Sequence, residues 1–121
     1  KIYRPKIIVS GTTAYPREID FKKIGKIAKK VGAYHLADIS HIAGLIIAKK
    51  HQSPFEFADV VTTTTHKTLN GPRGAVIFSK KELSQKINKS LFPGIQGGPH
   101  QNTIASIALT FKIAQTKKFK K

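Results

Sequence analysis

The sequence predicts an α/β fold in which a mostly parallel sheet is flanked by helices. Short β-branched apolar runs alternate with segments whose apolar residues recur at helical spacing, and Gly- or Pro-rich turns separate them. The chain of 121 residues has the length of one ordinary domain. Because it begins at Lys1 and contains no Met, we expect both ends to be cuts in a longer polypeptide.

The first half of the chain predicts a strand, a loop and an amphipathic helix. Residues 6–10 are a β-branched apolar run that stops at Gly11, and residues 12–16 form the loop that follows. The helix has its N-cap at Asp20 and ends at Gly32. Between these residues, apolar side chains recur at i, i+3, i+4 and i+7, and lysines occupy the opposite face.

Three more strands are predicted in the middle of the chain. The second strand, residues 34–38, ends on the carboxylate of Asp38, where strand ends of open α/β sheets usually meet a ligand. Residues 41–50 are apolar and predict a short helix or an irregular crossover. Residues 59–64 and 75–78 predict the third and fourth strands because they are rich in β-branched residues.

The remaining segments are loops and helices. Residues 65–74 are too rich in Gly and Pro for a regular element, so they predict a loop. Residues 80–90 predict a basic helix, and residues 92–99 another loop. A final helix is predicted from one apolar face, formed by Ile104, Ile107, Ala108, Phe111 and Ala114.

The charge of the chain is strongly positive, with 22 Lys and Arg against 6 Asp and Glu and a formal net charge of +16. A basic nucleic-acid-binding module is therefore one alternative. Most lysines, however, fall on polar helix faces or in residues 117–121, and few aromatic residues lie between them as a base-stacking surface requires. A solvated lysine-rich surface is the preferred interpretation.

Other classes of protein find little support in the composition. No apolar stretch approaches the roughly 20 residues that cross a bilayer, so no membrane partner is expected. The chain has no Cys, which suits a cytoplasmic protein. Its five histidines match no zinc spacing, so no metal site is expected.

Lys67 and Asp38 are the main candidates for chemistry. Lys67 lies in a loop after a strand and beside His66, and a lysine amine attacks a carbonyl when it is neutral. Asp38 precedes it by one strand–crossover–strand unit, so parallel pairing would bring both to one edge of the sheet. A pyridoxal-phosphate (PLP) enzyme needs such a pair, a Lys that binds the cofactor and an Asp at the pyridine nitrogen. The alternatives are a surface lysine and a helix-capping aspartate.

A third candidate is the sequence Gly97-Gly98-Pro99, which is expected to open the last helix with Pro99 near its first position. Backbone N–H groups there would suit a phosphate. A simple turn is the alternative, and no Walker A pattern is present.

Residues 60–74, VVTTTTHKTLNGPRG, resemble the PLP-lysine signature of serine hydroxymethyltransferases. Three further segments resemble the same family in the same order, namely residues 11–16 with Arg17 and Asp20, residues 38–45, and residues 92–99. The resemblance implies the central part of a fold-type I, aspartate aminotransferase-like large domain, without its N-terminal segment and C-terminal small domain. It also implies a homodimer that interconverts serine plus tetrahydrofolate with glycine plus 5,10-methylenetetrahydrofolate.

The resemblance assigns roles around the cofactor ring. Lys67 would form the internal aldimine with PLP, and His66 would tune its neighbourhood and the reaction specificity. Asp38 would pair with the pyridine nitrogen, while His41 and Thr13 would lie near the phenolic oxygen.

Further roles concern the loop and the phosphate. Thr64 would support the orientation of the lysine, and Arg73 would help to hold the same loop. Gly97 and Gly98 would approach the phosphate from the neighbouring subunit. The chain departs from the family at Ser40, where Ala is common, and at Thr13, where Ser is frequent.

The family's other substrate-binding groups cannot be located in this chain. We therefore expect the isolated 121-residue chain to be inactive, because positioning needs groups from several segments at once. Another fold-type I PLP enzyme, such as an aldolase or aminotransferase, is a second alternative that would share Lys67 and Asp38.

Overall fold

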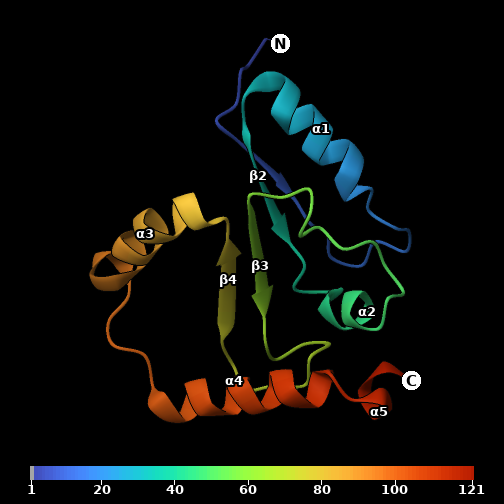
Figure 1. The fold of residues 1–121 in the computed structure, drawn as a ribbon, viewed down its shortest axis with the longest axis vertical. Coiled ribbons are helices and arrows are strands. Elements are labelled where there is room, and N and C mark those ends of the chain that lie inside the picture. Colours follow the sequence, from blue (N-terminus) through green and yellow to red (C-terminus); the bar gives the residue numbers. More distant parts are fainter. Residues whose placement is uncertain (1) are drawn as a thin grey trace.

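The computed structural model describes residues 2–121 and contains a four-stranded sheet in the order β1-β2-β3-β4. The strands are β1 (Ile7–Ser10), β2 (Tyr34–Asp38), β3 (Val60–Thr64) and β4 (Ala75–Ser79). β1, β2 and β3 are parallel, and β4 is antiparallel to β3 (Figure 1). The predicted α/β class and mostly parallel sheet are confirmed, and the four predicted strands are found within one residue at each end.

The three parallel strands end at the same edge of the sheet. Ser10 at the end of β1 pairs with Ala37, and Asp38 at the end of β2 pairs with Thr62 of β3. The loops that leave these three strands therefore begin close together, as they do in other open α/β sheets. Four of the candidate residues, Thr13, Asp38, His41 and Lys67, lie at this edge.

Helix α1 (Phe21–Val31) has the predicted caps. The Asp20 side chain accepts a hydrogen bond from the backbone N–H of Lys23 at 2.8 Å, and Gly32 ends the helix in the left-handed conformation with φ of 72°. Phe21 and Ala28 are buried, while the lysines face solvent. The amphipathic pattern of the sequence is thus confirmed except at Ile27, which is 48% exposed.

The crossover between β2 and β3 contains only a short helix, α2 (Ala43–Ile47). The structure thus contains one of the two forms predicted for residues 41–50. The core lies between α1, α2 and strands β2 and β3, and it consists of Ile19, Phe21, Ala37, Ile39, Ala43, Ala58, Val61 and Leu69.

After β4 the chain forms α3 (Lys81–Lys89), an irregular helical turn over Ser90–Ile95, α4 (Gln101–Ala114) and a short α5 (Lys117–Lys120). In Figure 1, α4 crosses below the connection between β3 and β4. The helix touches that connection, since a Cβ atom added to Gly71 would lie 2.7 Å from the Thr110 hydroxyl. α4 is therefore a support for the loop that carries Lys67.

The predicted start of the last helix is wrong. The backbone of His100 is extended, with φ of −70° and ψ of 120°, so α4 begins at Gln101. Pro99 thus lies before the N-cap and not at the first helical position, and Gly97 and Gly98 do not open the helix. The predicted apolar face is confirmed in part, because Ala114 is buried and Ile107 and Phe111 are half-buried, whereas Ile104 is half exposed and Thr110 is buried instead.

Much apolar surface remains exposed in the described part of the chain. Val9 of β1 is 67% exposed and Leu109 of α4 is 58% exposed. Exposed apolar surface of this extent usually packs against other protein. Among residues 2–121, none of the helices has the length and apolar character needed to cross a membrane.

Candidate active site

A cavity of about 250 Å³ lies where the three parallel strands end. This volume is slightly below the roughly 300 Å³ at which typical small-molecule sites begin. The residues that line it are Val9, Gly11, Thr12, Thr13, Asp38, Ser40, His41 and Lys67. Four predicted site residues are thus brought together, and the predicted placement of Asp38 and Lys67 on one edge of the sheet is confirmed.

Thr13 and His41 form one wall of this cavity. The Thr13 hydroxyl lies 3.2 Å from Nε2 of His41, so the loop after β1 is joined to the loop after β2. The tautomer of His41 decides which of the two groups donates. The pair places a hydroxyl and an imidazole beside the Asp38 carboxylate.

One carboxylate oxygen of Asp38 is hydrogen-bonded within the protein. Its Oδ1 accepts hydrogen bonds from the backbone N–H of Ser40 at 2.9 Å and from the Ser40 hydroxyl at 2.6 Å. Within residues 2–121 no protein group donates to Oδ2. The alternative role of Asp38 as a helix cap is wrong, because α2 has Ile42 at its N-cap and no side-chain cap.

Gly11 lets the loop after β1 approach Asp38 closely. A Cβ atom at position 11 would lie 2.5 Å from the backbone oxygen of Asp38 and 3.0 Å from its Cβ. Gly11 also has φ of 153°, which side chains rarely adopt. A glycine is therefore required at position 11 so that Thr12 and Thr13 can lie beside Asp38.

The loop with Lys67 is closed at its base by hydrogen bonds of Thr65. This fully buried residue donates its backbone N–H to the oxygen of Gly74 and its hydroxyl to the oxygen of Pro72, and its own oxygen accepts from Gly71. The loop is also joined to α2, since the Thr68 hydroxyl accepts from the N–H of Gly44 at 3.0 Å. Lys67 itself is half-buried. The hydrogen bonds of Thr65 and Thr68 support the backbone on both sides of it.

Two buried polar atoms next to Lys67 lack a partner in the described chain. They are the hydroxyl oxygen of Thr64 and Nδ1 of His66. Buried polar atoms normally have hydrogen bonds, so an atom without one suggests a group that binds there. Both lie in the chain within three residues of Lys67, although neither residue lines the cavity.

The remaining predicted site residues lie away from the cavity. Arg73 is exposed on the loop, and Gly97 and Gly98 are exposed between the irregular turn and α4. A Cβ atom added to either glycine would meet nothing within 4 Å.

Sequence reasoning missed two residues that shape the cavity, Ser40 and Gly11. A serine placed two residues after a strand-end aspartate was the available signal for Ser40, since such residues form local hydrogen bonds.

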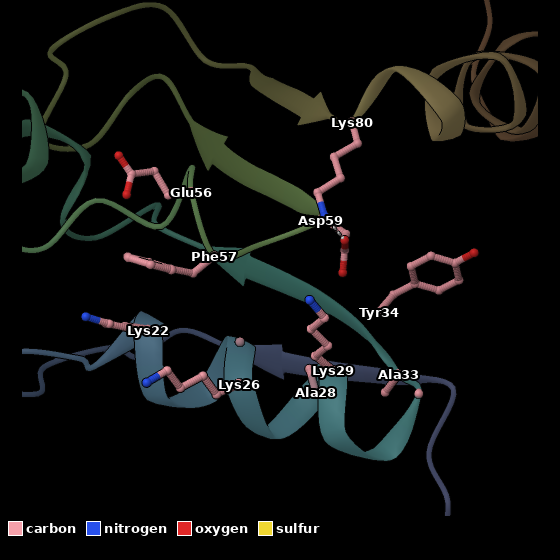
Figure 2. Close-up of a pocket in the computed structure, with 12 residues that line it drawn as sticks. Lys22, Lys26, Ala28, Lys29, Ala33, Tyr34, Glu56, Phe57, Asp59 and Lys80 are labelled. Carbon is pink, nitrogen blue, oxygen red and sulfur yellow. Dashed lines mark hydrogen bonds and ion pairs between the residues drawn. The ribbon is translucent and has the colours of Figure 1, made fainter.

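A larger cavity of about 590 Å³ lies at the opposite edge of the sheet, between α1 and the start of β2 (Figure 2). Lys22, Lys26 and Lys29 line it together with an ion pair between Asp59 and Lys80. Figure 2 shows Lys22 and Lys26 extending away from that pair. The charged groups do not converge on one point, so the smaller cavity is the better candidate for chemistry.

The ion pair shifts the pKa of both partners. Partial burial acts to raise the pKa of Asp59, but hydrogen bonds from Lys80 and from the backbone N–H of His35 outweigh burial, and the pKa lies below its ordinary value. The hydrogen bond to Asp59 raises the pKa of Lys80.

Comparison with known proteins gives a consistent result. The family model described as serine hydroxymethyltransferase matches residues 1–121. The serine hydroxymethyltransferase of Methanosarcina barkeri is 59% identical over 118 residues, which are 97% of this chain and 29% of that protein. The serine hydroxymethyltransferase of Rickettsia canadensis is 54% identical over 120 residues, or 98% and 29% of the two chains. The chain thus spans less than a third of these relatives.

Proposed function

Because the chain belongs to the serine hydroxymethyltransferase family, we propose that it forms the PLP-binding centre of a longer enzyme. That enzyme interconverts serine plus tetrahydrofolate with glycine plus 5,10-methylenetetrahydrofolate. The observation that carries the proposal is the position of Asp38 and Lys67 on one cavity. A PLP enzyme requires these two residue types at opposite ends of one ring.

The residues present fit the cofactor. Lys67 would hold PLP covalently through its amine, and the oxygen of Asp38 that has no protein donor would accept the pyridine N–H. His41 and Thr13 would lie beside the phenolic oxygen, and their mutual hydrogen bond already fixes both side chains. When bound, PLP supplies an electron sink for charge at the substrate α-carbon.

The loop residues would have supporting roles. Thr64 would orient the lysine and His66 would influence reaction specificity, and both lie within three residues of Lys67 in the chain. Arg73 would help to hold the loop.

A second copy of the chain is part of the proposal. Gly97 and Gly98 are exposed, and the open space around them would let a phosphate approach their backbone N–H groups. They lie outside the cavity, which supports a contribution to the site of a neighbouring subunit in a homodimer.

The chain would be the central part of a large domain. The exposed apolar residues of β1 and α4 support further segments that cover them, as does the 29% share of the relatives' length. Family membership and the scattered lysines favour this function over the nucleic-acid-binding alternative and over another fold-type I enzyme.

Borohydride trapping tests the proposal. The full-length enzyme should absorb in the near-ultraviolet or visible range, and borohydride should fix the cofactor on the peptide that contains Lys67. The substitution Lys67→Arg should abolish the adduct, since a guanidinium stays protonated and cannot take its place. The control Lys86→Arg changes an exposed lysine of α3 and should leave the adduct intact. A cofactor trapped on any other lysine would refute the proposal.

A further inference from the structure

We propose that Ser40 is a positioning residue that holds the Asp38 carboxylate for the cofactor and ties it to the strand leading to Lys67. The inference rests on the proposed function. It assigns a role to a hydroxyl at a position where the family resemblance leads one to expect alanine.

The hydrogen bonds of the Ser40 hydroxyl have defined directions. The hydroxyl oxygen lies 2.6 Å from Oδ1 of Asp38 and 3.0 Å from the backbone nitrogen of Thr64. A hydroxyl has one proton, an ionised carboxylate can only accept, and a backbone N–H can only donate. Ser40 therefore donates to Asp38 and accepts from Thr64, and the residue is 6% exposed.

These bonds orient the carboxylate. The N–H and the hydroxyl of Ser40 both point at Oδ1, so rotation of the carboxylate group would break two hydrogen bonds at once. The other oxygen remains available for a donor such as a pyridine N–H. Functional groups must be held within about half an ångström of the productive geometry, and local hydrogen bonds of this kind provide that precision.

The same hydroxyl joins β2 to β3 beyond their backbone pairing. The regular ladder ends where Ile39 donates to the oxygen of Thr62 at 2.9 Å. After this point the chain turns away from the sheet, and the Ser40 side chain makes the next connection, to Thr64. Thr64 is the last residue of β3, three positions before Lys67. One hydroxyl thus connects the carboxylate to the strand that carries the lysine.

An alanine would fill nearly the same space without these bonds. The N–H of Thr64 would lose its acceptor, and Oδ1 of Asp38 would keep only one donor. Loss of a hydrogen bond to a charged group weakens the arrangement more than loss of a neutral one. The proposal therefore predicts an effect on the cofactor in addition to an effect on stability.

Ser10 offers a matched control. It is a buried serine, 7% exposed, at the end of β1, and its hydroxyl bonds Nε2 of His35 at 2.7 Å. Within residues 2–121, the Ser10 hydroxyl bonds His35 and not Asp38, and Ser10 does not line the cavity. Ser10→Ala and Ser40→Ala thus remove the same group at similar burial, and only the second removes a bond to the carboxylate.

The test uses the full-length enzyme with PLP labelled with ¹⁵N in the ring. We expect Ser40→Ala to raise the dissociation constant of PLP by about five-fold or more and to move the ring-nitrogen resonance from its wild-type position. Ser10→Ala should leave both close to wild type. Thermal unfolding of the cofactor-free proteins should show comparable losses for the two variants.

The outcomes separate the two proposals. If Ser40→Ala binds PLP with wild-type affinity and an unchanged ring resonance, or if Ser10→Ala changes both equally, Ser40 has no positioning role. In either case a wild-type adduct on Lys67 would leave the proposed function intact. A wild-type enzyme without that adduct would overturn the function itself.

Discussion

Asp59 connects three parts of the fold through one carboxylate. Its two oxygens accept hydrogen bonds from Lys80 after β4 and from the backbone N–H of His35 in β2, and its own N–H donates to the oxygen of His35. The side chain of Lys80 is 52% exposed and that of Asp59 21%. Solvent therefore screens part of the attraction between them.

Asp59→Asn should remove a pH-dependent part of the stability. The pKa of Asp59 is lowered in the folded protein, so its contribution is present above the unfolded value of about 3.9 and is lost as the pH falls through the folded value. We expect the variant to be less stable by about 0.5–1 kcal/mol at neutral pH, the range for a partly exposed ion pair. Denaturant unfolding of both proteins from neutral to acid pH measures the difference.

The Asn variant keeps an oxygen acceptor for the N–H of His35, so the comparison isolates the charge. The free-energy difference between the two proteins should shrink as the pH falls below about 4. A difference of the same size at both ends of the pH range would contradict an ionic origin.

The sequence predicted the placement of some individual residues at the cavity and missed others. The placement of Asp38 and Lys67 on one cavity could be predicted, because parallel pairing of β2 and β3 brings the loops that leave these strands to the same end of the sheet. For Ser40 only the bond to Asp38 had a local signal in the sequence. Its bond to Thr64 and the approach of Gly11 to the Asp38 backbone could not be predicted, because they are contacts between segments. The directions of such contacts follow from tertiary structure and not from local pattern.

Among the elements, α1 shows how packing overrides helix propensity. Gly25 lies inside the helix, where glycine is normally unfavourable by about 1 kcal/mol relative to alanine. A Cβ atom at this position would lie 2.5 Å from the backbone oxygen of Phe57 and 3.1 Å from its Cβ. The glycine thus permits the helix to rest directly on the segment before β3.

Gly25→Ala should destabilise the protein despite the better helix former. Overpacking against backbone costs about 1–3 kcal/mol, which exceeds or at least offsets the gain in propensity. We expect a net loss of about 1 kcal/mol in unfolding free energy. Lys30→Ala, on the exposed face of the same helix, should stay within about 0.5 kcal/mol of wild type. Stabilisation by Gly25→Ala would show that α1 does not pack on Phe57 in this way.

The ends and directions of elements were predicted unevenly. Strong caps at Asp20 and Gly32 made α1 accurate, whereas Pro99 suggested a helix start that the extended backbone of His100 moves to Gln101. The antiparallel direction of β4 could have been predicted from the sequence. A parallel pair needs a crossover of a dozen or more residues, and residues 65–74 are too few for one.

At the level of the whole molecule, we propose that other segments of a longer protein complete the site. The cavity contains groups suited to the cofactor, and the four-stranded sheet leaves apolar residues of β1 and α4 exposed. An active site that orders two substrates needs groups from several segments at once. The location of those groups could not be predicted from this chain.

The purified 121-residue chain should therefore show no serine-dependent folate turnover. The full-length enzyme, assayed at the same concentration with added PLP, serves as the control and should be active. Formation of methylenetetrahydrofolate from serine is the measurement. Turnover by the short chain above the background of its Lys67→Arg variant would contradict the prediction.

The loop from Thr65 to Gly74 starts and finishes on two antiparallel strands, while Asp38 ends a strand of the parallel part. A ligand joined to Lys67 and hydrogen-bonded to Asp38 would therefore link β2 to β3 in addition to their backbone pairing. Removing that ligand would leave the hairpin of β3 and β4 less restrained relative to the rest of the sheet. Slow amide exchange in this hairpin would then report occupancy of the site.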